Sequence, residues 1–270
     1  MDAVVSSHGL SDNTEEAFAS LFQAEDRHFW FRARNKVLAR VVGQLVADMP
    51  AGYRVLEVGC GTGNVLRVLE QVCSRGQVMG MELYDEGLHY ARQRVRCPLI
   101  AGDIHTFKFP HPFHLIGLFD VLEHLPDDVR ILEALRKNLQ PGGKLLLTVP
   151  AHQSLWSYAD EYGGHYRRYS VQQLRAVLEE AGFRVEFVSQ FMMMLYPFLK
   201  LGRLWNGRGK TDSLEDKKAR SVRELQTSGF TNWTLYSLLQ WEAGWLTRRR
   251  RLPLGTSLLA IAEPVMGENA

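Results

Sequence analysis

The sequence is poor in cysteine and contains no long apolar run. Its 270 residues include three cysteines, Cys60, Cys73 and Cys97, and no two of them have the C-x-x-C spacing of a metal or redox pair. This small, odd number excludes a disulfide scaffold and favours a reduced, cytoplasmic compartment. The longest uncharged apolar stretch, Phe187–Leu199, is shorter than the roughly 20 residues that span a bilayer. Met1–Thr14 is polar and lacks the basic-then-apolar order of a secretory signal.

The sequence also lacks a strong net charge. Lys plus Arg number 32 and Asp plus Glu number 30. This near balance, without a recognisable binding module, argues against nucleic acid as a partner. The two parts of the chain differ, however: residues 1–150 hold 16 basic and 18 acidic side chains, and residues 151–270 hold 16 and 12. The basic excess lies in Arg167–Arg168 and Arg248–Arg251, which points to an anionic acceptor or an anionic surrounding.

Short apolar runs alternate with helix-like segments along most of the chain. Predicted strands cover Tyr53–Val58, Gln77–Met81, Leu99–Ala101, His114–Phe119, Lys144–Val149, Phe183–Gln190 and Ser257–Ala262. Predicted helices cover Thr14–Gln23, His28–Ala47, Asn64–Cys73, Asp85–Val95, Asp127–Leu139, Ser170–Ala181 and an amphipathic Thr231–Leu246. This alternation predicts an α/β fold with a parallel, doubly wound sheet that is covered on both faces.

The alternation stops after Gln190, where apolar and highly charged stretches follow one another. We therefore predict an N-terminal helical cap at residues 1–50 and an α/β core at residues 51–190. A helical insertion at residues 191–255 would form a lid or a dimer face. The final core strand and a tail would occupy residues 256–270.

The segment Val55–Asn64, VLEVGCGTGN, takes a buried strand into a glycine turn and then directly into a helix. Gly59, Gly61 and Gly63 permit positive φ angles and let a ligand approach the backbone N–H groups at the start of the helix. A dinucleotide-binding G-x-G-x-x-G loop would place its third glycine where this sequence has Asn64. The spacing therefore argues against a nicotinamide or flavin dinucleotide.

With Glu57 in the preceding strand, this segment resembles the E-x-G-x-G-x-G signature of class I S-adenosylmethionine-dependent methyltransferases. The resemblance covers about Phe29 to Gln190 and the final strand. It implies a Rossmann-like sheet of seven strands, mostly parallel with an antiparallel last strand, plus helical caps. It also implies S-adenosylmethionine as the cofactor.

Later motifs of this family follow in order. The resemblance implies that Glu82 accepts the ribose hydroxyls, that Asp103 receives the adenine amino group, and that Ile104 packs on the ring. The backbone after the fourth strand, in Leu118–Leu125, would border the methionine end of the cofactor. Asp85 is expected to be a helix N-cap instead. The residues implied to bind the cofactor are Trp30, Arg34, Glu57, Gly59, Cys60, Gly61, Gly63, Asn64, Glu82, Leu83, Asp103, Ile104 and Phe119.

Methyl transfer from a sulfonium is an in-line displacement, so the protein has to align the acceptor and, for a hydroxyl, remove a proton. Candidate groups are expected on the loops after the fourth and fifth strands. There, Gly164–Ser170 reads GHYRRYS and resembles the G-H-x-R-R-Y-S segment of a bacterial methyltransferase subgroup. The catalytic candidates are His124, His165, Tyr166 and Arg167.

Three roles stay open for His124 and His165. One of them could act as a general base, because imidazole titrates near neutral pH. Alternatively, both could bind a divalent metal with Glu123 and Asp120. That arrangement is similar to ubiquinone-pathway O-methyltransferases and small-RNA 2′-O-methyltransferases, which have E-x-x-E-H and a later His. Here the first acidic position is the shorter Asp120, and both histidines could equally be structural.

Two groups of arginines have alternative roles. Arg167 and Arg168 either clamp an acidic acceptor or pair with Asp160 and Glu161 inside the loop. Arg248–Arg251 follows an apolar helix, whose dipole favours cations at this end. Four arginines exceed what capping requires, so peripheral contact with an anionic lipid surface, or an anionic acceptor, is the alternative.

Together these features predict an enzyme that moves a methyl group to an oxygen, or else a nitrogen or sulfur, and leaves S-adenosylhomocysteine. The expected acceptor is a small molecule or a lipid- or sugar-linked group, and the expected assembly is a monomer or a homodimer. The alternative is a non-catalytic regulatory subunit that binds the cofactor within a methyltransferase complex.

Overall fold

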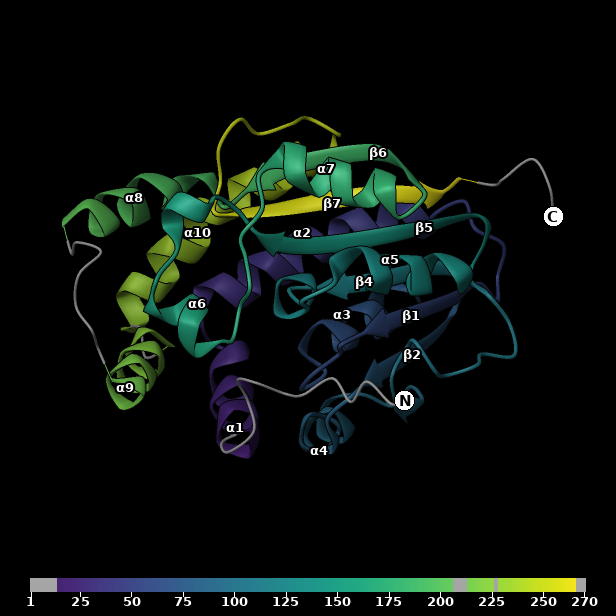
Figure 1. Cartoon of the computed structure of the whole chain (residues 1–270), viewed down its shortest axis with the longest axis horizontal. Coiled ribbons are helices and arrows are strands. Elements are labelled where there is room, and N and C mark those ends of the chain that lie inside the picture. The colour runs from purple at the N-terminus through teal and green to yellow at the C-terminus, as the bar shows by residue number, and fades with distance from the viewer. Residues whose placement is uncertain (1–13, 206–212, 226–227, 266–270) are drawn as a thin grey trace.

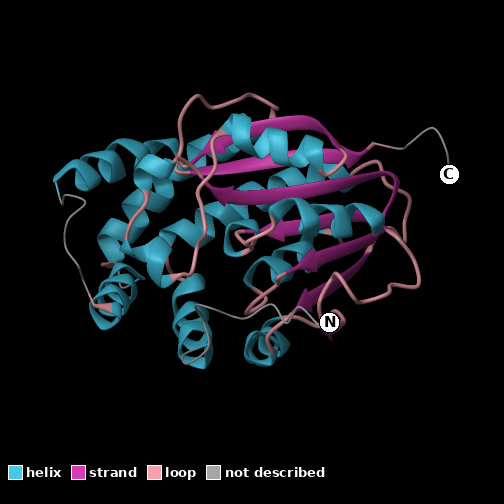
Figure 2. Ribbon diagram, viewed as in Figure 1, coloured by secondary structure: helices cyan, strands magenta, loops and turns pink. Residues whose placement is uncertain are grey.

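The computed structural model describes residues 14–205, 213–225 and 228–265. The polar N-terminus up to residue 13, residues 206–212 of the predicted insertion and the tail from residue 266 lie outside the described residues. The strands are β1 (Arg54–Val58), β2 (Gln77–Glu82), β3 (Leu99–Ala101), β4 (Phe113–Phe119), β5 (Leu139–Pro150), β6 (Phe183–Phe191) and β7 (Ser257–Pro264). They form one seven-stranded sheet in the order β3-β2-β1-β4-β5-β7-β6 (Figure 2).

The strands from β1 to β5 pair in parallel, whereas β7 is antiparallel to both of its neighbours, β5 and β6. The mostly parallel, doubly wound sheet with an antiparallel last strand is therefore confirmed. Carboxyl ends of parallel strands meet at one edge of a sheet, so the residues that follow β1, β2 and β4 come together there.

Helices cover both faces of the sheet. On one face lie α2 (Phe29–Val46), α3 (Asn64–Val72) and α4 (Asp85–Arg94), and on the other lie α5 (Asp128–Lys137) and α7 (Val171–Glu180) (Figure 1). Successive strand residues point to opposite faces: Val55 packs into the first layer and its neighbour Leu56 into the second. Burial on both faces explains why these strands are continuously apolar in the sequence.

Several helices begin at a residue whose side chain caps the first turn. Asp127 caps α5 by accepting the N–H of Arg130 at 3.0 Å. The expected N-cap role of Asp85 is wrong, because Tyr84 takes the N-cap position and Asp85 is the first residue of α4. Glu82 binds the amides of Leu83 and Tyr84 and so fixes the chain up to Tyr84, after which the helix begins at Asp85.

The remaining helices gather at the end of the sheet toward which β1, β4 and β5 point (Figure 1). They are α1 (Thr14–Glu25), α6 (Tyr158–Tyr162), α8 (Tyr196–Trp205), α9 (Leu214–Leu225) and α10 (Gly229–Thr247). Helix α10 packs on α2, α9 on α6, and α1 on α4. Across the described ranges, none of the helices has the length and apolar character needed to cross a membrane.

The predicted amphipathic character of α10 is wrong in one respect. Leu239 and Leu246 face the interior, as the periodicity requires. The opposite side is also apolar, with Phe230, Trp233 and Trp245 exposed to solvent by 79%, 64% and 50%. Packing on α2 uses only one side of the helix, so its second apolar side is left uncovered within the described structure.

Candidate active site

The glycine turn after β1 has a backbone that only glycine adopts readily. Gly59, Gly61 and Gly63 have φ angles of 71°, 50° and 77°. A Cβ atom at Gly59 would lie 2.5 Å from Val121 Cγ2, and one at Gly63 would lie 3.1 Å from the Cα of Ala91. At Gly61 the nearest atom to such a Cβ is a ring carbon of Phe18 at 3.8 Å. Gly61 is therefore the open position of the turn.

Glu82 joins the end of β2 to this turn. Its Oε2 accepts the N–H of Gly61 at 2.8 Å, and its Oε1 accepts the N–H groups of Leu83 and Tyr84 at 2.8 and 3.1 Å. Burial raises the pKa of Glu82, and these three amides act against the rise. An ionised carboxylate offers about four acceptor positions, so one remains after the three amides are bound.

Arg34 reaches the same region from α2. Its guanidinium donates to Asp120 Oδ2 at 2.7 Å and to Asn64 Oδ1 at 3.3 Å, and it lies 5.0 Å from the Trp30 ring. Asp120 directly follows β4 and has a φ of 54°, so the chain turns sharply there. Arg34 thus brings together the cap helix α2, the start of α3 and the end of β4.

Glu57, the acidic residue of β1, is buried near Arg34. Burial raises the pKa of its carboxyl well above the ordinary value, and the positive charge of Arg34 opposes the rise. Among the described residues, its Oε2 has no hydrogen-bond partner.

The other residues predicted to bind the cofactor lie in different environments. Asp103 follows β3 and accepts the N–H of His105 at 2.9 Å. Ile104 is buried, Leu83 is 59% exposed, and Phe119 is buried at the end of β4. The Cys60 side chain points into the core, where burial raises its pKa, and all three cysteines are free thiols.

Helix α1 packs over the glycine turn, and this contact was not predicted from the sequence. Glu25 binds both the hydroxyl of Thr62 and the guanidinium of Arg94, and Asp26 binds Arg67 of α3. The partners of Glu25 are 37 and 69 residues away in the chain, so no local pattern could reveal them.

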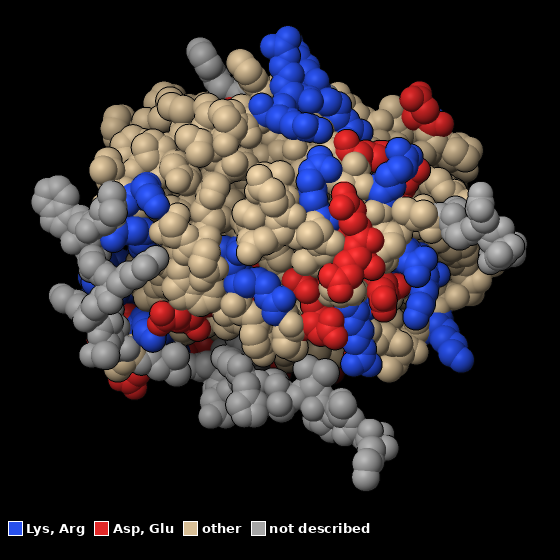
Figure 3. Space-filling view, turned by 45° about the horizontal axis from the view of Figure 1, so that its top comes forward, with Lys and Arg blue, Asp and Glu red and all other residues tan. Residues whose placement is uncertain are grey.

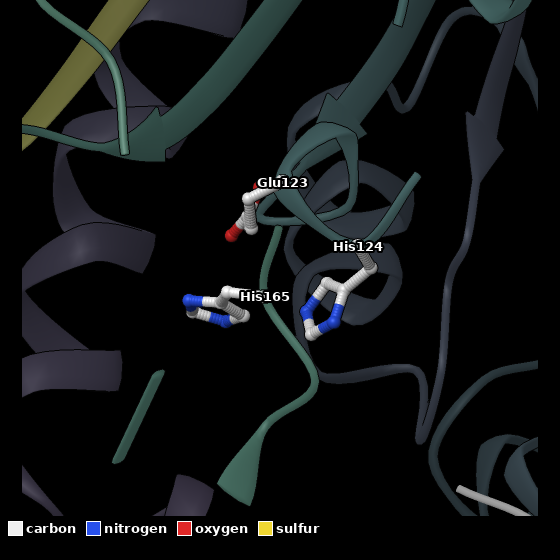
Figure 4. Close-up of side chains that lie close together, drawn as sticks. All are labelled: Glu123, His124 and His165. Carbon is white, nitrogen blue, oxygen red and sulfur yellow. The ribbon is translucent and has the colours of Figure 1, made fainter. Parts of the chain in front are cut away.

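A second group of side chains converges after β4. Glu123 and His124 come from a short 3-10 helix, Leu122–His124, and His165 comes from the loop after α6 (Figure 4). Potential ligand atoms of these three residues all lie within 4.8 Å of one another. The two imidazole rings are nearly perpendicular, with centroids 4.5 Å apart.

Asp160 holds His165 in place. Its Oδ1 lies 2.9 Å from His165 Nδ1 and also accepts Arg168 Nε at 2.7 Å. The Asp160 side chain has no exposed surface. Burial alone would raise its pKa, but the bond to His165 and the charge of Arg168 outweigh this and lower it to about 2. Because Nδ1 is engaged, Nε2 is the nitrogen of His165 left for chemistry.

The two neighbours of His165 differ in their protonation. Burial, followed by the proximity of His165, lowers the pKa of His124 to about 3, so His124 is neutral at neutral pH. Burial and the nearby Asp120 raise the pKa of Glu123 well above its usual range. Within the part of the chain that is described, Glu123 Oε2 has no partner.

The two arginines after His165 take different partners. Arg168 pairs with Asp160 inside the loop, which is one of the two expected arrangements. Arg167 pairs instead with Asp128 of α5 at 2.8 Å and with two carbonyl oxygens before α5, and neither alternative foresaw this. Tyr166 is 50% exposed, and its N–H donates to the carbonyl of Glu123.

Comparison with known proteins decides the family. A family model described as a methyltransferase domain matches residues 23–188, which is more than half of the chain. The chain belongs to the class I S-adenosylmethionine-dependent methyltransferases. It is an enzyme of that family, and S-adenosylmethionine is its cofactor.

Relatives of this methyltransferase carry names from the same class. It is 31% identical to an S-adenosylmethionine-dependent methyltransferase of Mycolicibacterium smegmatis over 60% of this chain and 62% of that one, less than two thirds of the relative. It is 28% identical to a ubiquinone biosynthesis O-methyltransferase of Xanthomonas axonopodis, over 73% and 92% of the two chains.

The fold of the methyltransferase is also found in solved structures. A phosphoethanolamine N-methyltransferase of Haemonchus contortus, in complex with S-adenosylhomocysteine, superposes with a TM-score of 0.59 at 19% identity. The match covers 94% of this chain and 58% of that one. At this identity the likeness concerns the fold alone.

Proposed function

We propose that this methyltransferase transfers a methyl group to an oxygen nucleophile of a small or lipid- or sugar-linked acceptor, with His165 as the base that takes the acceptor proton. The observation that carries the proposal is the bond between Asp160 and His165 Nδ1 at 2.9 Å. A buried carboxylate on one imidazole nitrogen fixes the tautomer and leaves the other nitrogen to accept a proton. Relatives named ubiquinone biosynthesis O-methyltransferases support an oxygen acceptor.

The residues around the glycine turn fit the cofactor on two observations. Gly61 leaves space on one side of the turn, and Glu82 keeps an acceptor position for a hydroxyl. We assign Glu82 to the ribose, Asp103 and Ile104 to the adenine, and the glycine amides to the turn around the bound molecule. When bound, the cofactor supplies an already activated methyl group next to its sulfonium.

Arg34 would hold the carboxylate of the cofactor. It already binds a carboxylate, that of Asp120, at 2.7 Å, and it is buried beside the glycine turn. Asn64, whose amide oxygen lies 3.3 Å from the same guanidinium, would position it. Exchange of Asp120 for a ligand carboxylate conserves the charge-assisted geometry.

His165 would act as proton acceptor through Nε2, with Nδ1 held by Asp160. Its Nδ1–H donates to Asp160, so a proton gained at Nε2 leaves an imidazolium that the carboxylate stabilises. Arg168 keeps Asp160 ionised through the 2.7 Å bond to Oδ1. Asp160 and Arg168 are thus positioning residues for His165.

The same cluster also fits a divalent cation, which we keep as the second candidate role. Glu123 has a buried oxygen without a described partner, and His124 is neutral, as a metal ligand has to be. Glu123, His124 and His165 would hold the ion, which would polarise the acceptor oxygen. Asp120, the fourth position of the resembling motif, is paired with Arg34 instead.

The test measures S-adenosylhomocysteine formation with a panel of phenol, catechol, carboxylate and amine acceptors. We expect His165→Gln to abolish turnover of an oxygen acceptor and to keep S-adenosylmethionine binding unchanged by calorimetry. If this variant still turns over the oxygen acceptor, His165 is not the base. Absence of turnover by the native enzyme with every acceptor favours the regulatory alternative.

Metal analysis of the purified protein separates the two roles of the cluster. If the base role is right, the enzyme is fully active after chelation and holds no stoichiometric metal. Loss of activity on chelation, restored by Mg²⁺ or Mn²⁺ and absent in Glu123→Gln, assigns the cluster to a cation instead.

A further inference from the structure

Two exposed apolar surfaces lie on α8 and α10, which both pack against the short 3-10 helix Met193–Leu195 after β6. On α10, Phe230 and Trp233 are one turn apart and are exposed by 79% and 64%. On α8, Phe198 and Leu201 have the same spacing and are exposed by 66% and 62%. Large aromatic side chains that face water are unfavourable on an isolated surface, so such a set marks a contact site.

The orientation of α10 is fixed by its buried side. The Glu242 carboxylate, buried between α10 and the chain after β6, accepts the N–H groups of Met193 and Met194 at 2.8 and 2.9 Å. Leu239 and Leu246 are buried on the same side of the helix. The helix therefore has no freedom to turn Phe230 and Trp233 inward.

Four consecutive arginines follow the end of α10. All of Arg248–Arg251 are exposed, and Arg250 lies over the ring of Trp245 at 5.6 Å. The loop is held to the sheet at its far end, because Leu252 is buried and its N–H donates to Ser189 Oγ at 2.9 Å. The basic side chains are thus presented by an ordered loop beside Trp245, whereas Phe230 and Trp233 lie at the opposite end of α10, roughly 25 Å away along the helix.

A shallow groove lies between this loop and β6. Its volume is about 580 Å³, and it is lined by Glu186, Phe187, Arg249 and Arg251. Arg249 stacks over Phe187 at 5.5 Å, and the Glu186 carboxylate is neutralised by Lys144 at 2.6 Å. The groove consequently presents positive charge. In Figure 3 a group of basic side chains projects at the top of the molecule, where the loop after α10 runs in Figure 1.

We propose that α8, α10 and Arg248–Arg251 form a surface that docks the enzyme on an anionic lipid bilayer. Aromatic side chains insert at the level of the headgroups, and arginines bind the phosphates above them. The charge identifies the occupant: helix capping requires fewer cations, and an apolar protein partner would not require four arginines. A second copy of this chain would bring a second arginine cluster to the same interface, which is repulsive.

The docking surface belongs to the group of helices at the carboxyl ends of the strands (Figure 1). The catalytic cluster after β4 lies at this edge of the sheet too. Binding at the surface does not depend on the proposed base, and it would hold the enzyme where a lipid-linked acceptor resides. The inference therefore stands apart from the proposed reaction and can fail or succeed independently of it.

The test is flotation of the full-length protein with vesicles of phosphatidylcholine alone or mixed with phosphatidylglycerol. We expect binding to the mixed vesicles only, weakened by salt because screening reduces attraction between the arginines and the phosphates. The variant R248Q/R249Q/R250Q/R251Q should bind at least about tenfold more weakly. The matched control, R92Q/R96Q/R130Q/K137Q, removes four exposed basic residues from other parts of the surface and should bind as the native protein does.

A second variant separates insertion from plain charge attraction. Phe230→Ser with Trp233→Ser should reduce vesicle binding and remove part of the blue shift in tryptophan fluorescence that the native protein shows with mixed vesicles. Circular dichroism and S-adenosylmethionine binding serve as the folding checks for every variant.

Two results would overturn the proposal. One is absence of binding to the mixed vesicles at low salt, with all folding checks passed. The other is equal loss of binding in the control and in the arginine variant, which would show a general charge effect. A concentration-dependent dimer that the Phe230 and Trp233 changes abolish, without vesicle binding, would assign the surface to a second copy instead.

Discussion

Asp160→Asn is the substitution that tests the positioning of His165 most directly. Asp160 Oδ1 receives His165 Nδ1 and Arg168 Nε, and its Oδ2 receives the N–H of Ser157 at 2.8 Å. An asparagine keeps one acceptor oxygen and places an NH₂ group on the other side. That group faces donors in either orientation, so at least one side of the network is lost.

The magnitude follows from burial. The Asp160 side chain is 0% exposed and that of Arg168 is 13% exposed, so the variant leaves a nearly buried guanidinium without its anion. Breaking a buried pair of this kind costs about 3–5 kcal/mol. A domain is stabilised by about 5–15 kcal/mol in total, so the variant should fold but unfold at clearly lower urea concentration.

Two measurements test the roles of Asp160 in stability and in catalysis. Urea unfolding gives the loss of stability, and turnover is compared at a temperature at which both proteins are fully folded. The control is Glu161→Gln, because the neighbouring Glu161 is 43% exposed and pairs with Lys217 at the surface. It should lose under about 1 kcal/mol. If Asp160→Asn loses no more than this control, the argument from the buried pair is refuted; if kcat is unchanged, Asp160 does not position the base.

Three further predictions concern the cofactor region and the sheet. Gly61→Ala should weaken S-adenosylmethionine binding, measured by calorimetry, and should cost only about 1–2 kcal/mol of stability from its φ of 50°. Gly59→Ala should destabilise the fold more, because its Cβ would approach Val121 to 2.5 Å. Thermal unfolding measures this difference in stability. Arg34→Met should raise the dissociation constant for S-adenosylmethionine by about 10- to 100-fold, since a hydrogen bond to a charged group contributes about 1.5–3 kcal/mol; an unchanged constant contradicts the assignment. Hydrogen bonds from Lys144, then from Arg184, lower the pKa of Glu263 to about 2. The stability that the ionised Glu263 adds is therefore present above the ordinary pKa of 4.5 and is lost as the pH falls through 2. Glu263→Gln should be less stable than the native protein at pH 7, and the difference in unfolding free energy should vanish between pH 4.5 and pH 2.

The features that the sequence made predictable are those with local causes. The glycine turn is one, since its residues are contiguous and its geometry depends on glycine itself. The strands and helices of the core are others, because burial on one or two faces leaves a periodic pattern. The pairing of Arg168 with Asp160 was also predictable, because the two residues are only eight positions apart in the sequence.

The features that escaped prediction depend on contacts between distant segments. Arg34 and Asp120 are 86 residues apart, and Glu25 meets Arg94 across 69 residues. Periodicity predicted α10 as a helix, but which of its apolar sides packs on α2 is decided by tertiary contacts. The pairing of Arg167 with Asp128 likewise required the loop and α5 to be placed side by side.

The position of β7 has a consequence for how the chain reaches its folded state. β7 lies between β5 and β6, so β6 has no sheet partner until residues 257–264 have joined the sheet. Until then two strand edges stay open, and open edges are sites at which other chains can add. The half of the sheet from β3 to β5 can assemble earlier, because each of its strands pairs with a neighbour that precedes β6. During synthesis the half from β3 to β5 would fold before β7 is available to pair with β5 and β6. Chaperone binding is therefore expected at the edges of β5 and β6.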